Sequence, residues 1–264
     1  MDKRVDESAG DFVNIAGIPF DVDGGIAERA TIGVIVLATD QTVEHEFRLV
    51  MDLPGVAFYE ARIFNDATIT PDTLRAMEGR IAETAGLILP GMPLDVVAYG
   101  CTSASMVIGE ERVFELVNKA RPEAKVTTPI TGAFAAFRAF GARRIGVLTP
   151  YRDDINRFMR DYIESKGFEV PVFGSFNEEN DHKVARIAPA SIREALLRIG
   201  RHDAVDAVFV SCTSLRLAGV AAEVEAELGK PVTSSNHAMA WHCLRLAGVG
   251  DRVPRFGRLY ELGL

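Results

Sequence analysis

The order of buried strands and helices most limits what this chain can fold into. Short apolar runs bounded by turn residues indicate buried strands, and the longer amphipathic segments between them indicate helices. Strands that alternate with helices predict a parallel α/β fold. The predicted strands are 31–38, 56–64, 95–100, 125–128, 144–150, 168–174, 204–211 and 231–234. The predicted helices include 71–85, 109–120, 130–140, 152–166, 189–200, 217–228 and 235–247.

The order of these segments occurs twice. IGV at 32–34 recurs at 145–147, and LDVVAYGCTSAS (94–105) has a counterpart in VDAVFVSCTSLR (205–216). KVTTPITGAFAAFRAFG (125–141) likewise resembles PVTSSNHAMAWHCLRLAG (231–248). Three matches in one order over so long a period indicate two homologous domains rather than a solenoid. We expect an N-terminal arm (1–30), a first α/β domain (31–141) and a second (142–264), whose last helix packs back on the first.

The composition excludes several classes of partner. The chain has 37 acidic and 29 basic residues and a formal net charge of -8, which argues against electrostatic binding of nucleic acid. No segment approaches the roughly 20 apolar residues of a membrane helix, and the charged N-terminus lacks the apolar core of a signal peptide. Three cysteines without CxxC spacing fit a reducing compartment. We therefore expect a cytoplasmic protein that binds neither nucleic acid nor membrane.

No cofactor motif stands out. The sequence has neither a Walker loop nor a GxGxxG fingerprint. Its histidines show no metal-binding spacing; they are His45, His182, His202, His237 and His242. We expect no cofactor and no metal.

Each half places a cysteine directly after a predicted strand. Cys101 follows DVVAYG and Cys212 follows AVDAVFVS, each continued by Thr-Ser. Ligands of open parallel sheets bind beyond the carboxyl ends of the strands. A helix N-terminus there should lower the thiol pKa, and the Thr and Ser groups should hold a carboxylate. One buried cysteine would be unremarkable, but recurrence at equivalent points favours a function. Cys243, within an apolar helical segment, is interpreted as core.

Nearly all of the chain from Thr31 onward resembles the aspartate/glutamate racemase superfamily. The resemblance is carried by YGCTSAS around Cys101, LTPY ending at Tyr151, and VSCTSLR around Cys212. It is greatest to the branch of maleate cis–trans isomerases, arylmalonate decarboxylases and ectoine-utilisation protein A. Membership implies two flavodoxin-like (Rossmann-like) domains with four-stranded parallel sheets, related by a pseudo-twofold axis, with the active site in the interdomain cleft.

The resemblance also assigns roles to individual residues. Cys101 would be the nucleophile or first base, and Cys212 the opposing acid/base. The substrate-binding residues would be Thr102, Ser103, Tyr151, Thr213, Gln41 and Asn180. Family members commonly associate, so a homodimer is expected, with the arm packed on the partner subunit.

The sequence departs from the family after its first strand. Maleate isomerases typically have Ser-Asn-Thr at this point, whereas this chain has Asp40, Gln41 and Thr42. Asp40 would place negative charge beside a dianionic substrate, which favours an amino-acid-like or less anionic one. Alternatively, Asp40 caps the helix that begins near Thr42.

Two opposed thiols suit racemisation by two bases or cis–trans isomerisation by addition and elimination. We expect an isomerase or racemase of a small carboxylic or amino acid, for which the resemblance suggests a place in ectoine catabolism. The alternatives are an arylmalonate-type decarboxylase, in which only the second cysteine is retained, and a non-catalytic carboxylate-binding or accessory protein.

Overall fold

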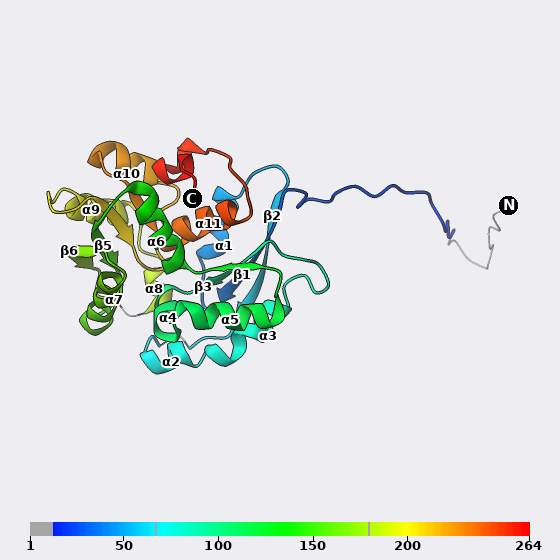
Figure 1. The fold of residues 1–264 in the computed structure, drawn as a ribbon, viewed down its shortest axis with the longest axis horizontal. Coiled ribbons are helices and arrows are strands. Elements are labelled where there is room, and N and C mark those ends of the chain that lie inside the picture. The colour runs from blue at the N-terminus through cyan, green and yellow to red at the C-terminus, as the bar shows by residue number, and fades with distance from the viewer. Residues whose placement is uncertain (1–12, 67, 179) are drawn as a thin grey trace.

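The computed structural model describes residues 13–66, 68–178 and 180–264 and contains two parallel sheets of four strands (Figure 1). The first has the order β2-β1-β3-β4, and the second has the matching order β6-β5-β7-β8. The strands of the first are β1 (Ala30–Leu37), β2 (Val56–Ile63), β3 (Val96–Gly100) and β4 (Lys125–Thr127). Those of the second are β5 (Arg144–Thr149), β6 (Glu169–Ser175), β7 (Ala207–Val210) and β8 (Val232–Ser234). The predicted fold class of two similar α/β halves is confirmed.

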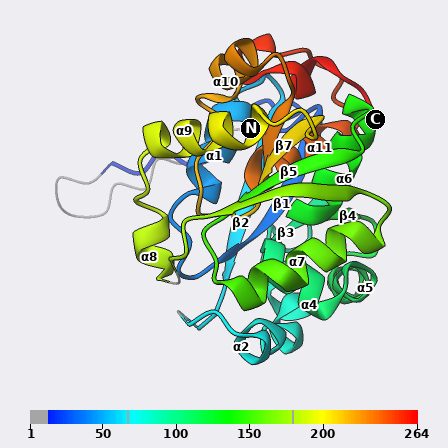
Figure 2. The same cartoon turned by 90° about the vertical axis from the view of Figure 1, so that its left-hand side faces the viewer.

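Helices connect these strands in both halves. In the first half they are α1 (Val43–Val50), α2 (Pro71–Arg75), η1 (Glu78–Arg80), α3 (Ile81–Gly86), α4 (Thr102–Ile108), α5 (Glu110–Ala120) and α6 (Pro129–Phe140). In the second they are α7 (Asp153–Ser165), α8 (Asp181–Val184), α9 (Pro189–Gly200), α10 (Ala221–Leu228), α11 (Ser235–Leu246), η2 (Pro254–Phe256) and η3 (Arg258–Glu261). Figure 2 shows α9 and α10 at one end of the molecule and α2, α4 and α5 at the other.

Two predicted helices differ from those observed. The segment 71–85 is divided into α2, η1 and α3. Leu74, Met77 and Ile81 are buried along it, so the apolar periodicity persists although Gly79, a poor helix former, lies at the division. Helix α10 begins at Ala221 rather than at 217, which leaves a turn between Cys212 and the helix. That turn shapes the second half of the site.

The central strands β1 and β3 of the first sheet are buried on both faces. Ile32, Val34 and Val36 of β1 join an apolar core that runs on into the second half. Ile35 and the β3 residue Tyr99 point the other way, into a separate core with α3 and α5. A shared core on one face therefore fixes the two sheets relative to each other.

Helices α6 and α11 cross at the centre of the molecule and contact both halves (Figure 1). Helix α11 also packs against β3 and α1, and α6 against β7. Their close approach depends on Gly132, where an added Cβ would lie 2.9 Å from the Ala238 carbonyl oxygen. This contact holds the strand ends that carry the two cysteines in one place.

Residues 13–25 lead away from the body as an extended chain (Figure 1). The predicted arm spans 1–30; residues 1–12 lie outside the described part of the chain, and Ala30 already belongs to β1. The apolar side chains between them are between 66% and 86% exposed; they are Val13, Ile15, Ile18, Phe20, Val22 and Ile26. A surface of this kind is typical of a contact with another protein.

Candidate active site

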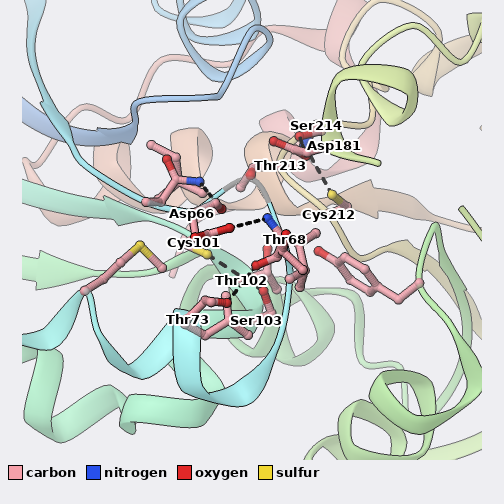
Figure 3. Close-up of a pocket in the computed structure, with 16 residues that line it drawn as sticks. Asp66, Thr68, Thr73, Cys101, Thr102, Ser103, Asp181, Cys212, Thr213 and Ser214 are labelled. Atoms are coloured by element: carbon pink, nitrogen blue, oxygen red, sulfur yellow. Dashed lines mark hydrogen bonds between the residues drawn. The ribbon is translucent and has the colours of Figure 1, made fainter. Parts of the chain in front are cut away.

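Cys101 and Cys212 lie just beyond the carboxyl ends of the equivalent strands β3 and β7. Cys101 has an extended backbone (φ -141°, ψ 115°) and directly precedes α4. Cys212 instead enters a turn, since α10 does not begin until Ala221. Both cysteines are free thiols and line the same cavity, on opposite sides of it in Figure 3.

The cavity is formed by both halves of the chain. Its lining comprises two thiols, two carboxylates, an amide, several hydroxyls and an apolar wall: Leu37, Asn65, Asp66, Thr68, Ile69, Thr73, Leu74, Met77, Cys101, Thr102, Ser103, Tyr151, Asp181, Cys212, Thr213 and Ser214. Its volume of about 30 Å³ has room for one or two water molecules.

Hydrogen-bond donors surround each sulfur, yet burial raises both thiol pKa values. The Ser103 hydroxyl lies 3.8 Å from Cys101 Sγ, and the Ser214 N–H donates to Cys212 Sγ over 3.4 Å. These donors favour the thiolate, but burial outweighs them and raises the pKa of Cys101 to about 11 and that of Cys212 to about 12. The expected lowering of the thiol pKa is wrong, because desolvation of the thiolate outweighs the local dipoles.

Tyr151 is placed against the second thiol. Its hydroxyl donates a hydrogen bond to the Cys212 sulfur, which lowers the pKa of that thiol against the larger effect of burial. Tyr151 is itself buried, and burial together with the neighbouring sulfur raises its own pKa well above the usual value. It stays a protonated donor at neutral pH. The predicted contact of its hydroxyl with a substrate carboxylate requires the same proton.

Thr102 and Thr213 line the cavity and also link the two halves. The Thr102 hydroxyl donates to Ser235 Oγ at the start of α11, over 2.8 Å. The Thr213 carbonyl oxygen accepts from the Thr42 hydroxyl of the first half and from Asn236 Nδ2. The backbone beside Cys212 is thus fixed from the other half of the molecule.

Two predicted site residues lie outside the cavity lining. Gln41 is exposed, and its Nε2 pairs with His182 Nδ1 over 2.9 Å. Asn180 caps α8, and its Oδ1 accepts from the Lys183 N–H over 3.0 Å. Both side chains are occupied by local hydrogen bonds, so a direct contact with substrate stays a prediction for each.

Asp40 combines the two interpretations that its sequence position left open. Its Oδ1 accepts from the N–H groups of Thr42 and Val43 at the start of α1. Burial raises its pKa to about 6, and its charge adds to the raised pKa values of both cavity cysteines. Its Oδ2 is buried without a normal hydrogen bond among the described residues, although the nearby Thr213 hydroxyl lowers the pKa. Asp40 caps a helix and carries charge near the site.

Sequence reasoning missed Asp181, which is next to the predicted Asn180. Asp181 begins α8, and its Oδ1 accepts from the Ser214 hydroxyl over 2.7 Å. Its Oδ2 accepts from the Thr39 hydroxyl of the first half over 3.0 Å. In Figure 3 it lies beside Ser214 and Cys212. The chain at Asn180 therefore does reach the site, but through the side chain of the next residue.

The structure also identifies a buried carboxylate behind the site. Glu46 of α1 accepts from the N–H groups of Leu217 and Ala218, over 2.7 Å each, and from Asn236 Nδ2 over 2.9 Å. Burial raises its pKa to about 7. Because its donors all belong to the second half, Glu46 joins the two halves next to the Cys212 turn.

Within residues 13–66, 68–178 and 180–264, no group of three or more His, Cys, Asp or Glu side chains is placed to hold a metal ion. No helix over the same residues is long and apolar enough to span a membrane.

Comparison with known proteins places this arrangement in a family. The chain is 27% identical to maleate isomerase of Alcaligenes faecalis, over 86% of this chain and 95% of that protein. It is 29% identical to arylmalonate decarboxylase of Bordetella bronchiseptica, over 89% of this chain and 98% of that protein.

Solved structures agree with these sequence matches. The crystal structure of a Pseudomonas putida maleate isomerase superposes with a TM-score of 0.80 at 26% identity, over 88% of this chain and 98% of that one. A maleate cis–trans isomerase variant of Nocardia farcinica, with a covalently bound succinylcysteine intermediate, has a TM-score of 0.79 at 26% identity and the same coverage. The sequence model of the arylmalonate decarboxylase family matches residues 32–260. The chain therefore belongs to the arylmalonate decarboxylase family, in the branch that it shares with the maleate isomerases.

Proposed function

We propose that this isomerase converts a small carboxylic or amino acid by means of two opposed thiols, Cys101 and Cys212, without an organic cofactor. The observation that carries the proposal is that two free cysteines from equivalent strand ends line one cavity. A site that only binds a carboxylate has no need of two thiols facing each other. The substrate lies between them, and each sulfur serves one of its faces.

Two reactions use this geometry. In racemisation, one thiolate removes the proton α to a carboxylate and the opposite thiol returns a proton to the other face. In cis–trans isomerisation, a thiolate adds to an alkene carbon, the new single bond rotates, and elimination restores the double bond. The succinylcysteine adduct in the Nocardia farcinica relative supports addition as a route within the family. Both reactions require donors for the charge that develops on the carboxylate.

Hydroxyl groups of the cavity supply such donors. Ser103 and Thr102 lie beside Cys101, and Tyr151 lies beside Cys212. Tyr151 donates from a buried position, so its hydrogen bond to developing charge is little screened by water. We assign carboxylate binding to these three residues, with Thr213 supporting the second thiol. Thr102 donates its hydroxyl proton to Ser235 and Tyr151 donates its own to Cys212, so both hydroxyls have to turn toward the carboxylate when the substrate binds.

An arylmalonate-type decarboxylase is the second candidate, because the relative in Bordetella bronchiseptica has that activity. The presence of Cys101 favours isomerisation, since the resemblance implies that arylmalonate decarboxylases retain only the second of the two cysteines. We also propose, from the family resemblance, that the enzyme acts in the cytoplasm in ectoine catabolism.

A substrate screen by proton NMR in D2O tests the proposal. Maleate, aspartate, diaminobutyrate-type acids and an arylmalonate are incubated with the wild-type enzyme and with a Cys101→Ser, Cys212→Ser double variant. We expect one acid to isomerise or exchange its α-proton with the wild type only. Cys243→Ser is the matched control, since Cys243 is buried in α11 away from the cavity lining. Turnover that survives in the double variant contradicts the proposal, and loss of carbon dioxide favours the decarboxylase.

A further inference from the structure

The described residues that line the cavity carry negative charge and include no positively charged side chain. Asp66 and Asp181 both line it, and of the described residues around it none is a lysine, arginine or histidine. Asp40 lies buried nearby and adds its charge to the surroundings of both thiols. A substrate with two carboxylates would meet like charges in a poorly screened space, where their repulsion is strong.

Asp181 is the carboxylate best placed to meet a substrate. It lies beside Cys212 in Figure 3, whereas Asp66 is exposed and its Oδ1 accepts from the Thr68 N–H of its own loop. Each oxygen of Asp181 accepts one described hydrogen bond, from Ser214 and from Thr39. A carboxylate oxygen can accept a second, so both retain capacity toward the cavity.

We propose that Asp181 is a specificity-determining residue that binds an ammonium group of the substrate. The substrate is then a small zwitterion of the amino-acid class with a single reacting carboxylate, rather than a dicarboxylate. The inference rests on the proposed function in taking this cavity as the site of catalysis. It adds the residue that selects the substrate and the charge that the substrate carries.

The same charge affects the thiols. Burial is the main cause of their raised pKa values, and the negative charge of Asp181 raises both further. An ammonium group bound to Asp181 offsets that charge and makes either thiolate easier to form. A second substrate carboxylate in its place would have the opposite effect. Substrate selection and thiol activation therefore depend on one ion pair.

Asp181 also has a structural role, because its hydrogen bonds join Thr39 of the first half to Ser214 of the second. The variants have to separate charge from structure. Asp181→Asn removes the charge and keeps hydrogen-bonding groups of the same size. Thr39→Val removes one of the structural hydrogen bonds and leaves the charge. Asp181→Glu keeps the charge and moves it, and Glu83→Gln removes an exposed charge from α3, outside the cavity lining.

The experiment measures ligand binding by isothermal titration calorimetry with the full chain near neutral pH. The probes are butyrate, 2-aminobutyrate, 4-aminobutyrate, 2,4-diaminobutyrate and maleate, which have four carbons and differ in charge. For the wild type we expect at least one aminated acid to bind tenfold or more tightly than butyrate, and more tightly than maleate. Asp181→Asn should bring the ratio of aminated acid to butyrate close to one and strengthen maleate binding. Asp181→Glu, Thr39→Val and Glu83→Gln should keep the preference.

Two results would overturn the inference. One is a wild-type enzyme that binds no aminated acid more tightly than butyrate or maleate. The other is an Asp181→Asn variant, folded by its thermal transition, that keeps the wild-type preference. If Asp181→Asn does not fold, Asp181→Glu and Thr39→Val still decide the matter, since loss of the preference in Thr39→Val alone would assign it to structure. Because the calorimetry measures binding without turnover, its outcome is independent of whether the two thiols catalyse the proposed reaction.

Discussion

The side-chain amide of Asn236 in α11 donates to the carboxylate of Glu46 in α1 over 2.9 Å, across the boundary between the two halves. The same Nδ2 also donates to the carbonyl oxygen of Thr213, the residue after Cys212. One buried pair thus connects the first half of the chain to the backbone that carries the second thiol. A break in this pair should affect both folding and the position of Cys212.

Glu46 makes the stability of the protein depend on pH. Its pKa is raised from 4.5 to about 7, chiefly by burial. A carboxyl group whose pKa is raised on folding contributes stability below pH 4.5 that is lost as the pH rises through about 7. Glu46→Gln cannot ionise, so the free energy of unfolding of the wild type should fall relative to this variant between those pH values. Urea unfolding of both proteins at a series of pH values measures the difference, and a constant difference would contradict the assignment.

Glu46→Met tests the hydrogen bonds rather than the charge. Methionine leaves the N–H groups of Leu217 and Ala218 buried without their acceptor, at a cost of about 1–3 kcal/mol for each group. Glutamine keeps an acceptor oxygen for them, so Glu46→Met should be the less stable variant at every pH. Equal stabilities of the two would show that these hydrogen bonds contribute little.

Replacement of each cavity cysteine by serine should distinguish the two reactions. In a two-base racemase both Cys101→Ser and Cys212→Ser lose turnover, while each can still exchange the α-proton of one enantiomer through the surviving thiol. In addition–elimination, the variant of the nucleophile loses all activity, and its partner accumulates a covalent adduct. Turnover assays, exchange in D2O and intact mass spectrometry provide the readouts. Full activity in both variants would exclude a catalytic role for the pair.

The raised thiol pKa values predict slow alkylation of the resting enzyme. With a pKa of about 11, only roughly one Cys101 in ten thousand is a thiolate at pH 7. The rate of iodoacetamide labelling at Cys101 and Cys212 should therefore rise about tenfold for each pH unit between 7 and 10. Peptide mass spectrometry assigns the labelled sites, with the fully buried Cys243 as the control. Rapid labelling that levels off near neutral pH would show that the resting site favours the thiolate.

Gly132→Ala should separate the two central helices. The new Cβ would lie 2.9 Å from the backbone oxygen of Ala238, so α6 or α11 must move, at a cost of about 1–3 kcal/mol. Gly86→Ala is the matched control, because its Cβ would meet only Ala120, at 3.9 Å. Thermal unfolding should show a lower transition temperature for Gly132→Ala alone. Similar transitions for both variants would mean that the crossing is loosely packed.

The exposed arm leads us to expect a homodimer in which residues 13–26 pack on the partner subunit. An extended segment of this length reaches roughly 45 Å. Phe20 and Val22 are its most exposed apolar residues, at 84% and 86%. Phe20→Asp combined with Val22→Asp should shift the protein from dimer to monomer in analytical ultracentrifugation, whereas Asp21→Asn should not. A wild type that sediments as a monomer, or a double variant that remains dimeric, would contradict this expectation.

The sequence by itself determined the architecture, because the pattern of apolar strands and amphipathic helices is local and occurs twice. The apolar runs of β1, β3, β5 and β7 predict buried parallel strands wherever they occur. The repeat of the Cys-Thr-Ser motif then implies equivalent positions in two equivalent halves. Tyr151, the last residue of the LTPY motif, also lines the cavity. Residues attached directly to strand ends were predictable, because the strand fixes where they lie.

Only the tertiary structure decided the electrostatics of the site and the residues that complete it. Asp181, rather than Asn180, lines the cavity. Neighbouring residues at the start of a helix point in different directions, and here Asn180 caps α8. The thiol pKa values follow from the burial produced by two halves together, which no local pattern records. Glu46 in a surface-like helical pattern is buried because its three donors come from the other half of the chain. Desolvation and pairing between distant segments are properties of the assembled fold, so the sequence specifies them only through that fold.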